Sequence, residues 1–258
     1  MNLILPQASI NLFIIGDVEM YGYDADFQEL WGDFDMDTKL RGVLLRYYES
    51  FIVYGKENYD VHGFAKIIKS YDFTPSISGE QSVLKPLRPL LGDGYRVQDT
   101  YFAECRMETL QTSHNEILQN QVKKATAADA PGIAELLFSI DEFNMKQTLD
   151  FDAYIERMTK RYNDKAGRDY FIEVDGKVVS SVSTTAENST SAMLVGVCTA
   201  PDYRMQGYTT AILSKLLTEL FTEKESVCLF YDNPKAGNIY KRSGFQDIGI
   251  WTMLQPII

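Results

Sequence analysis

The sequence predicts an α/β protein made of two lobes. Its 258 residues exceed the commonest size of one domain, about 100–150 residues. Along the chain, β-branched runs alternate with stretches that are apolar at helical spacing. The clearest alternation, residues 194–245, has the order strand, loop, helix, strand, helix. We place one lobe over residues 1–115 and the other over residues 116–258, with a polar linker near residue 115.

The second lobe is predicted to run β, α, α, β, β, β, α, β, α, β. Asp175-Gly176 between two alternating runs is a strong hairpin signal. Asp129 and Pro131 are typical of a helix start. The predicted strands are residues 122–126, the two arms of the hairpin within 170–184, 192–199, 226–231 and 248–254, and the helices are 127–140, 151–162, one from about 206 and one after 233.

The first lobe is predicted to be a smaller α/β unit. Its strands are expected at residues 27–31, 42–47, 50–54, 73–78 and 101–110, and its helices at 61–70 and 79–85. Ser78-Gly79-Glu80 is interpreted as the capped start of the second helix, which Pro86 should stop. Asp17, Glu19 and Asp24 are interpreted as a solvated turn rather than a metal or acid–base cluster.

The segment after strand 192–199 indicates an anion site. A helix start leaves four N–H groups without intrahelical partners and carries the positive end of the helix dipole. Gly207 lets backbone approach a ligand closely, and Arg204 adds a permanent cation. This loop is therefore expected to hold a phosphate or pyrophosphate.

A second segment follows the buried strand 226–231. Asp232 or Asn233 should cap a short helix, and Pro234 suits its first turn. The helix carries Tyr240 and is followed by Gly244-Phe245.

Together the two segments resemble the GNAT superfamily of acyl-CoA-dependent N-acyltransferases. The first signature of that family falls on Arg204, Gly207 and Thr209, and the second on Asn233, Ala236, Tyr240, Gly244 and Phe245. Thr209 departs from the usual Gly or Ala, so its side chain either fits beside the phosphates or bonds one through its hydroxyl. The resemblance covers about residues 119–258, and the first lobe resembles a degenerate GNAT half without the Arg-x-x-Gly signature.

The resemblance implies a fold and a set of site residues. The C-terminal lobe should have a mixed sheet, flanked by helices and splayed between its fourth and fifth strands, with acetyl-CoA or another acyl-CoA in the gap. Tyr240 should protonate the departing CoA thiolate, since a phenol is protonated at neutral pH. The cosubstrate should be bound by the backbone of Val197, Cys198 and Thr199, by the loop residues Arg204, Met205, Gln206, Gly207, Tyr208 and Thr209, and by Asn233.

The function so implied is transfer of an acetyl group from acetyl-CoA to a primary amine, of a small molecule or a peptide, held between the lobes. The general base stays open among Glu142, Glu173, Glu187 and a water chain. The alternative is a catalytically silent acyl-CoA-binding or sensing module whose first lobe binds a partner protein. Acceptor identity, acyl length and oligomeric state also stay open.

The composition of the chain limits the ligands, the cellular location and the metal sites that we expect. A net charge of −11 disfavours nucleic-acid binding. An acidic surface can attract a cationic amine or polyamine, but we favour plain solubility as the explanation. The N-terminus does not have the pattern of a signal peptide, and no apolar stretch is long enough to span a bilayer, so we expect a cytoplasmic protein. Three widely spaced cysteines suit reduced thiols, and with only His62 and His114 available we expect no metal.

Overall fold

The computed structural model describes residues 3–23, 25–113 and 115–257. The chain forms two compact units. The first comprises Met1–Ala103, Phe230–Asp232 and Asp247–Ile258, and the second comprises Glu104–Leu229 and Asn233–Gln246. Because the units interleave along the sequence, their compactness does not test the division into consecutive lobes at residue 115, which stays a prediction.

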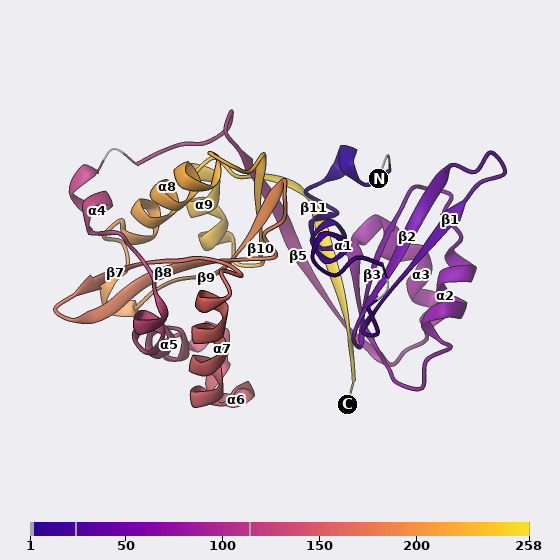
Figure 1. Cartoon of the computed structure of the whole chain (residues 1–258), viewed down its shortest axis with the longest axis horizontal. Helices are drawn as coiled ribbons and strands as arrows, with labels where there is room; N and C mark the ends of the chain where they lie inside the picture. The colour runs from indigo at the N-terminus through magenta and orange to yellow at the C-terminus, as the bar shows by residue number, and fades with distance from the viewer. Residues whose placement is uncertain (1–2, 24, 114, 258) are drawn as a thin grey trace. The chain divides into compact units, whose positions relative to one another are not determined.

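The first unit is a sheet with helices packed on it (Figure 1). Its strands lie in the order β1-β2-β3-β4-β11-β5. Antiparallel pairing joins β1 to β2, β2 to β3 and β4 to β11, whereas β3 and β4 are parallel. The elements are α1 (Leu12–Tyr21), β1 (Gln28–Phe34), β2 (Leu40–Tyr47), β3 (Ser50–Gly55), α2 (Val61–Ile68), β4 (Ser76–Glu80), α3 (Gln81–Leu91), β5 (Tyr95–Arg106) and β11 (Gln246–Pro256).

Two details of the first unit differ from the sequence prediction. Ser78, Gly79 and Glu80 lie in strand β4 instead of opening a helix, and α3 continues through Pro86 and Pro89 to Leu91. A proline inside a helix costs about 3 kcal/mol. The face of α3 that carries Val83, Leu84 and Leu87 is buried in the core, and each such side chain contributes about 1.5–3 kcal/mol. The free energy gained by burying this face therefore outweighs the cost of the two prolines inside the helix.

The acidic stretch near the N-terminus is also not a turn. Asp17 lies within helix α1, and Glu19 follows it on the same helix. Asp24 lies outside the described residues. The strand predicted from residue 101 also begins earlier, at Tyr95. Most residues of 95–100 are half-buried or exposed, so the hydrophobic pattern there is too weak to indicate a strand from the sequence.

From α4 to α9 the second unit follows the predicted order, with two additional short α-helices, α4 and α6. The predicted last strand, residues 248–254, is β11 and belongs to the first unit. Its sheet order is β10-β9-β8-β7-β6. Helices α5 and α7 cover one face of this sheet, and α8 and α9 lie on the other (Figure 1). The elements are α4 (Glu116–Gln121), β6 (Lys123–Lys124), α5 (Ala130–Ser139), α6 (Met145–Thr148), α7 (Phe151–Asn163), β7 (Asp169–Val174), β8 (Lys177–Thr185), β9 (Ser191–Thr199), α8 (Tyr208–Leu220), β10 (Ser226–Tyr231) and α9 (Pro234–Arg242).

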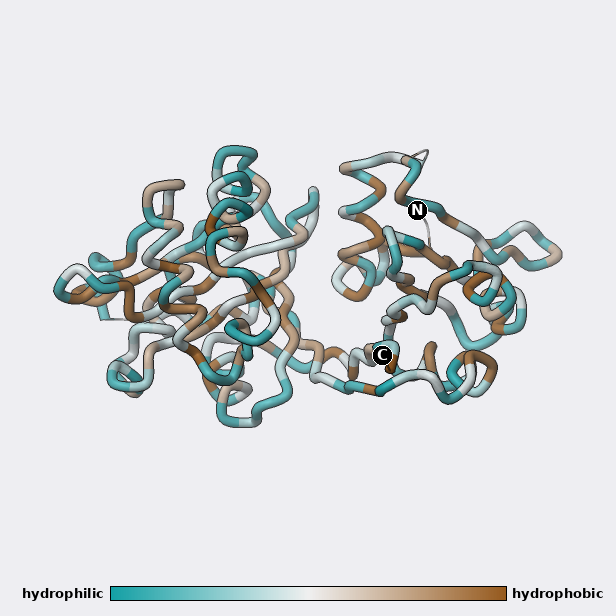
Figure 2. The backbone as a smooth tube through the Cα atoms, turned by 90° about the horizontal axis from the view of Figure 1, so that it is seen from below, coloured by the Kyte–Doolittle hydropathy of each residue, from teal (hydrophilic) through white to brown (hydrophobic). Residues whose placement is uncertain are grey.

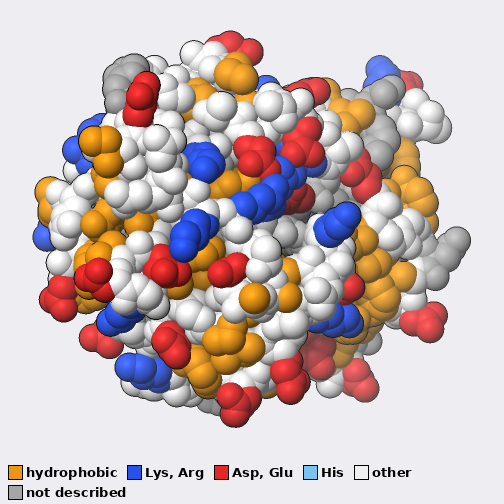
Figure 3. Space-filling view, turned by 60° about the vertical axis from the view of Figure 1, so that its left-hand side comes forward, with side chains coloured by type: hydrophobic (Ala, Val, Ile, Leu, Met, Phe, Trp, Pro, Cys, Tyr) orange, Lys and Arg blue, Asp and Glu red, His pale blue; other side chains and the backbone are white. Residues whose placement is uncertain are grey.

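Apolar side chains fill the interior of this unit. One cluster joins Ile133 and Leu137 of α5 to Met158 of α7, Phe171 of β7 and Cys198 of β9. Figure 2 shows hydrophobic segments along the strands and helix faces, with hydrophilic residues at the connections. On the face in Figure 3, Lys and Arg side chains lie next to Asp and Glu side chains rather than forming one basic surface. The core thus holds the sheet rigid beneath the loops that follow β9 and β10.

Three further observations concern the described residues. No helix among them is long and apolar enough to cross a membrane. Cys105, Cys198 and Cys228 are buried, and none of them forms a disulfide with another described residue. Within the same residues, no group of His, Cys, Asp and Glu side chains is arranged to hold a metal ion; His114 is not among them.

Candidate active site

The last part of β9 has one edge without a partner strand. β10 pairs with β9 in parallel from Ser191↔Ser226 to Leu194↔Leu229, and within the described chain this pairing ends there. On its other side β9 stays paired with β8 up to Thr199. Residues 195–199, which include Val197, Cys198 and Thr199, thus have a free edge on the side of β10. Such an edge can pair with an extended ligand as another strand would.

A bulge marks the point where this free edge begins. On β8, Ser181 and Ser183 face Cys198 and Val195, so that two residues of β9 oppose one residue of β8 between them. Gly196 lies in the bulge with φ +60°, a conformation that glycine adopts without strain. The bulge changes the direction of the β9 backbone directly after Leu194, where its pairing with β10 ends. The sequence analysis did not identify it, although a glycine inside a strand pattern is its usual signal.

The loop after β9 ends in a helix whose first amides are available. Gly207 is the N-cap of α8, with φ +87° and no side-chain capping bond. Among the described residues, the first backbone amide of this helix to donate a backbone hydrogen bond is that of Ala211, to the Gly207 carbonyl at 3.0 Å. The amides of Tyr208 and Thr209 precede it, and Met205 is 98% exposed. The loop therefore presents N–H groups at the positive end of a helix dipole.

Arg204 is held at the entrance of this loop. Its Nε donates to the carbonyl oxygen of Thr199 at 3.1 Å, and one terminal nitrogen lies 3.0 Å from the Glu142 carboxylate. Gln206 beside it donates to the Asp202 carbonyl at 3.4 Å. The guanidinium is thus held at the end of β9, where the loop begins, and remains partly exposed to a ligand.

Thr209 has a hydroxyl partner inside the protein. Its Oγ1 lies 2.7 Å from Oγ1 of Thr199, which in turn lies 2.8 Å from Oγ of Ser180. Ser180 also donates to the carbonyl of Cys198 at 2.9 Å. This chain of hydroxyls joins β8, the end of β9 and the first turn of α8. The branched residue at this position therefore fixes the loop to the sheet.

The second signature forms the helix that was predicted. The Asn233 side chain accepts a hydrogen bond from the Lys235 amide at 2.9 Å and caps α9, which confirms the predicted cap. After the helix, Gly244 has φ +102°, and a Cβ there would lie 2.1 Å from the carbonyl oxygen of Thr109. Only glycine fits this position. Phe245 then packs edge-on against the ring of Tyr240.

Tyr240 of the second signature is buried, and the Cys198 thiol on β9 lies within electrostatic range of its phenol. Tyr240 is 7% exposed, and its pKa is raised to about 12 by burial and further by the neighbouring Cys198 thiol. Burial likewise raises the pKa of Cys198 to about 11. At neutral pH the phenol and the thiol are therefore both protonated. Such a thiol is a poor nucleophile, because the thiolate is the reactive form.

The three glutamates considered as a general base each have a cationic partner. Glu142 pairs with Arg204, Glu173 lies 3.3 Å from Lys123, and Glu187 lies 2.7 Å from Arg168. The pKa of Glu142 is lowered by a backbone hydrogen bond and by Arg204. Arg204 thus stabilises the Glu142 carboxylate as an ion, and none of the three glutamates lines the cavity at the β9 bulge that is described below.

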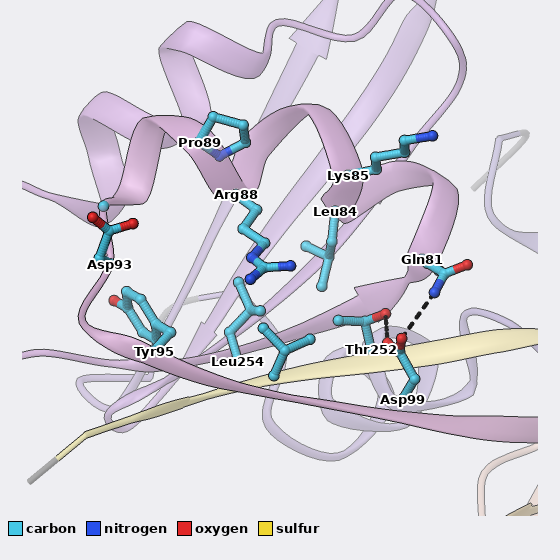
Figure 4. Close-up of a pocket in the computed structure, with 12 residues that line it drawn as sticks. Gln81, Leu84, Lys85, Arg88, Pro89, Asp93, Tyr95, Asp99, Thr252 and Leu254 are labelled. Atoms are coloured by element: carbon cyan, nitrogen blue, oxygen red, sulfur yellow. Dashed lines mark hydrogen bonds between the residues drawn. The ribbon is translucent and has the colours of Figure 1, made fainter.

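Two concave sites lie near the elements described. One, of about 370 Å³, borders the bulge of β9 and is lined from α7 by residues such as Tyr154 and Arg157; sequence reasoning did not identify it. The other, of about 550 Å³, is a groove of the first unit. In that groove Arg88 extends from α3 toward Leu254, and Asp99 accepts hydrogen bonds from Gln81 and Thr252 (Figure 4). It contains none of the signature residues.

The comparisons with known proteins agree with this geometry. The sequence model described as the acetyltransferase (GNAT) family matches residues 134–245. The second unit carries a GNAT acetyltransferase domain. The matched residues extend from α5 through the free edge of β9 and the α8 loop to the end of the α9 segment. No curated protein matches the sequence of the whole chain at a significant level.

Solved structures share the fold of this chain at low sequence identity. A GCN5-related N-acetyltransferase from Kribbella flavida aligns with a TM-score of 0.62 at 14% identity, over 95% of each chain. A GCN5-related N-acetyltransferase-like protein from Streptococcus suis gives 0.54 at 16%, over 100% of both chains. A tandem GNAT protein from the clavulanic acid biosynthesis pathway gives 0.53 at 11%, over 95% of this chain and 86% of that one. At these identities the likeness shows the fold alone.

Proposed function

We propose that the GNAT domain transfers an acetyl or related acyl group from CoA directly to an amine. The observation that carries this proposal is the buried Tyr240 of α9, whose phenol lies within electrostatic range of Cys198 on the part of β9 that has the free edge. The free edge is followed by a loop with available amides and the cation Arg204. A ligand with an extended arm that ends in a pyrophosphate would use both, the edge for the arm and the loop for the pyrophosphate. A site for binding alone would need the edge and the loop but no proton donor.

The residues fit acetyl-CoA as the cosubstrate. The backbone of Val197, Cys198 and Thr199 would pair with the pantetheine arm along the free edge. The amides of residues 205–209 and the guanidinium of Arg204 would hold the pyrophosphate. The side-chain oxygen of Asn233 is used by the helix cap, which leaves its NH₂ group to donate to the same arm. Bound in this way, the cosubstrate supplies an activated acyl group as a thioester.

The proposed reaction needs one acid and one proton acceptor. The amine nitrogen attacks the thioester carbonyl carbon, a C–N bond forms, and the C–S bond breaks. Tyr240 gives its phenolic proton to the departing sulfur, the proton lost by the amine passes to water, and water returns a proton to the Tyr240 phenolate. Cys198 does not carry the acyl group, because burial keeps it as a thiol. Among the described residues no carboxylate lines the cavity at the bulge, so a water chain is the proton acceptor we favour.

The proposed chemistry belongs to the second unit. In the first unit, the parallel strands β3 and β4 are paired from Ser50↔Ser76 to Val53↔Gly79. A Cβ at Gly79 would lie 2.5 Å from the Val53 carbonyl oxygen, so β3 and β4 are still in close contact at the end of their pairing. In the second unit, by contrast, β9 and β10 separate after Leu194. Among the described residues, β3 and β4 therefore leave no gap between them for an extended arm, in keeping with a degenerate lobe.

The test is a screen for thiol release by the full chain. Acetyl-CoA and propionyl-CoA are each incubated with amines of several classes, and free CoA is measured with a thiol reagent. Release that depends on both amine and enzyme supports the proposal. CoA binding by calorimetry without release in any amine class would instead support the silent binding module. Absence of CoA binding would refute both.

A further inference from the structure

The cavity beside the β9 bulge is the concave site nearest to the free edge. It has a volume of about 370 Å³ and belongs wholly to the second unit. Its walls come from the segment after α5 (Phe143, Met145), from α7 (Tyr154, Arg157) and from β9 (Val195, Gly196). Every one of these segments lies within residues 134–245, which match the GNAT family model.

The position of the cavity connects it to the reacting end of the cosubstrate. The phosphate loop follows Thr199 at one end of the free edge, and Val195 and Gly196 lie at the other end. A strand advances about 3.3 Å per residue, so the two ends are about 13 Å apart. An arm that starts at the loop and follows the edge therefore brings its far end, the thioester, to the cavity. This step rests on the proposed function.

The wall of the cavity combines apolar surface with one uncommitted cation. Arg161 also lines it, but this guanidinium is engaged by the buried Asp169 carboxylate and donates to the Thr184 carbonyl at 2.9 Å. Arg157 lies with its guanidinium carbon 5.6 Å from the centre of the Tyr154 ring. Among the described residues no carboxylate is within salt-bridge distance of Arg157. Its charge is thus available to a ligand.

We propose that this cavity binds the acceptor and that Arg157 binds an anionic group of it. The acceptor class is an amine that carries a carboxylate and an apolar or aromatic body, as in an apolar amino acid. The apolar wall takes the body, and the planar guanidinium binds the carboxylate through two parallel hydrogen bonds. A polyamine would place like charge against Arg157, so the acidic surface of the chain does not indicate the acceptor.

The first experiment compares amines that differ only in the carboxylate. The probes are L-phenylalanine against 2-phenylethylamine and L-leucine against 3-methylbutylamine, with acetyl-CoA and thiol release as the readout. We expect the wild-type chain to prefer the carboxylate member by about tenfold or more in kcat/KM. Arg157→Gln should remove that preference by raising KM, with kcat within about twofold of its original value.

Lys160→Gln is the matched control, since it removes one positive charge from the same helix α7 without lining the cavity. It should leave the preference intact. A wild-type preference for the neutral amines would overturn the proposal, and so would an unchanged preference in Arg157→Gln.

A binding measurement separates this inference from the proposed function. 3-Phenylpropanoate has the body and the carboxylate but no amine, and its binding to the CoA-saturated chain is followed by ligand-observed NMR. Binding to wild type and Lys160→Gln, but not to Arg157→Gln, supports the anion site even if no amine is ever acylated. No binding to wild type, or equal binding to Arg157→Gln, overturns the inference, whatever the thiol assay gives.

Discussion

The hydroxyl of Thr199, at the end of β9, lies 2.7 Å from the hydroxyl of Thr209, in the first turn of α8. The loop between them includes Arg204 and Gly207 and is proposed to hold the pyrophosphate. The contact ties both ends of that loop to each other and, through Ser180, to β8. A residue that departs from the usual Gly or Ala of the family signature therefore has a structural role in the loop.

This contact predicts a difference between two substitutions at Thr209. Thr209→Val keeps the shape but removes the hydroxyl, and it should lower the free energy of unfolding by about 1 kcal/mol and weaken CoA binding by severalfold. Thr209→Ser keeps the hydroxyl and should behave like the wild type. Urea unfolding and CoA calorimetry on both variants test this. Equal behaviour of the two variants would show that the hydroxyl contact contributes nothing.

Arg204 and Glu142 give a second prediction. Their salt bridge of 3.0 Å is largely exposed, with 45% and 57% of the side chains accessible. If Arg204 binds phosphate, Glu142 competes for the same cation, so Glu142→Gln should tighten CoA binding by about two- to fivefold, within the range of exposed ion pairs. The gain should shrink at high salt, because exposed charges are screened.

The control for that prediction is the neighbouring carboxylate. Asp141→Asn removes the same charge one residue away, without a contact to Arg204 among the described ion pairs, and should change CoA affinity less. Weaker CoA binding by Glu142→Gln would contradict the competition and would indicate that Glu142 orients the guanidinium.

The third prediction concerns Tyr240 and pH. General acid catalysis requires the protonated phenol, and its pKa is raised to about 12, so the acid stays protonated as pH rises through the ordinary tyrosine range. The pH profile of kcat should therefore show no loss from this group below about pH 10. Tyr240→Phe should lower kcat about 100-fold across that range with little change in CoA affinity. An unchanged kcat in Tyr240→Phe would disprove the general-acid assignment, whereas an alkaline limb near pH 8 that disappears in Tyr240→Phe would contradict the raised pKa.

Local signals in the sequence predicted most elements of the second unit correctly. Asp175 and Gly176 both adopt positive φ, +51° and +79°, as a two-residue hairpin turn requires. Asn233 caps α9 as expected. Residues of this kind determine structure through their own backbone preferences, so they can be interpreted without knowing what packs on them.

Features that depend on distant partners could not be predicted in the same way. The continuation of α3 through Pro86 depends on the burial of its apolar face, and the place of β11 beside β4 depends on pairing across most of the chain. Arg157 lies on the polar side of an amphipathic helix, where the sequence indicates a solvated charge. Only the fold shows that this side borders the cavity at Gly196.

The fourth prediction concerns stability and arises from Asp17 in helix α1. Burial raises the pKa of this carboxyl to about 6 from an ordinary value of 3.8, so between about pH 4 and pH 6 the folded chain binds more protons than the unfolded chain. Stability should therefore fall as pH rises through this window and stay reduced above it. Asp17→Asn should restore about 1 kcal/mol at pH 7, since the group remains partly solvated, and nothing at pH 4.

Asp26→Asn is the control for the Asp17 prediction, because it removes a carboxylate that is exposed to water. It should leave the urea midpoint unchanged at both pH values, whereas Asp17→Asn should raise the midpoint only at pH 7. A midpoint that Asp17→Asn lowers at pH 7 would mean that the ionised carboxylate has a stabilising contact in the folded chain. The sign of the change therefore tests the burial argument directly, because desolvation alone acts on this group in one direction.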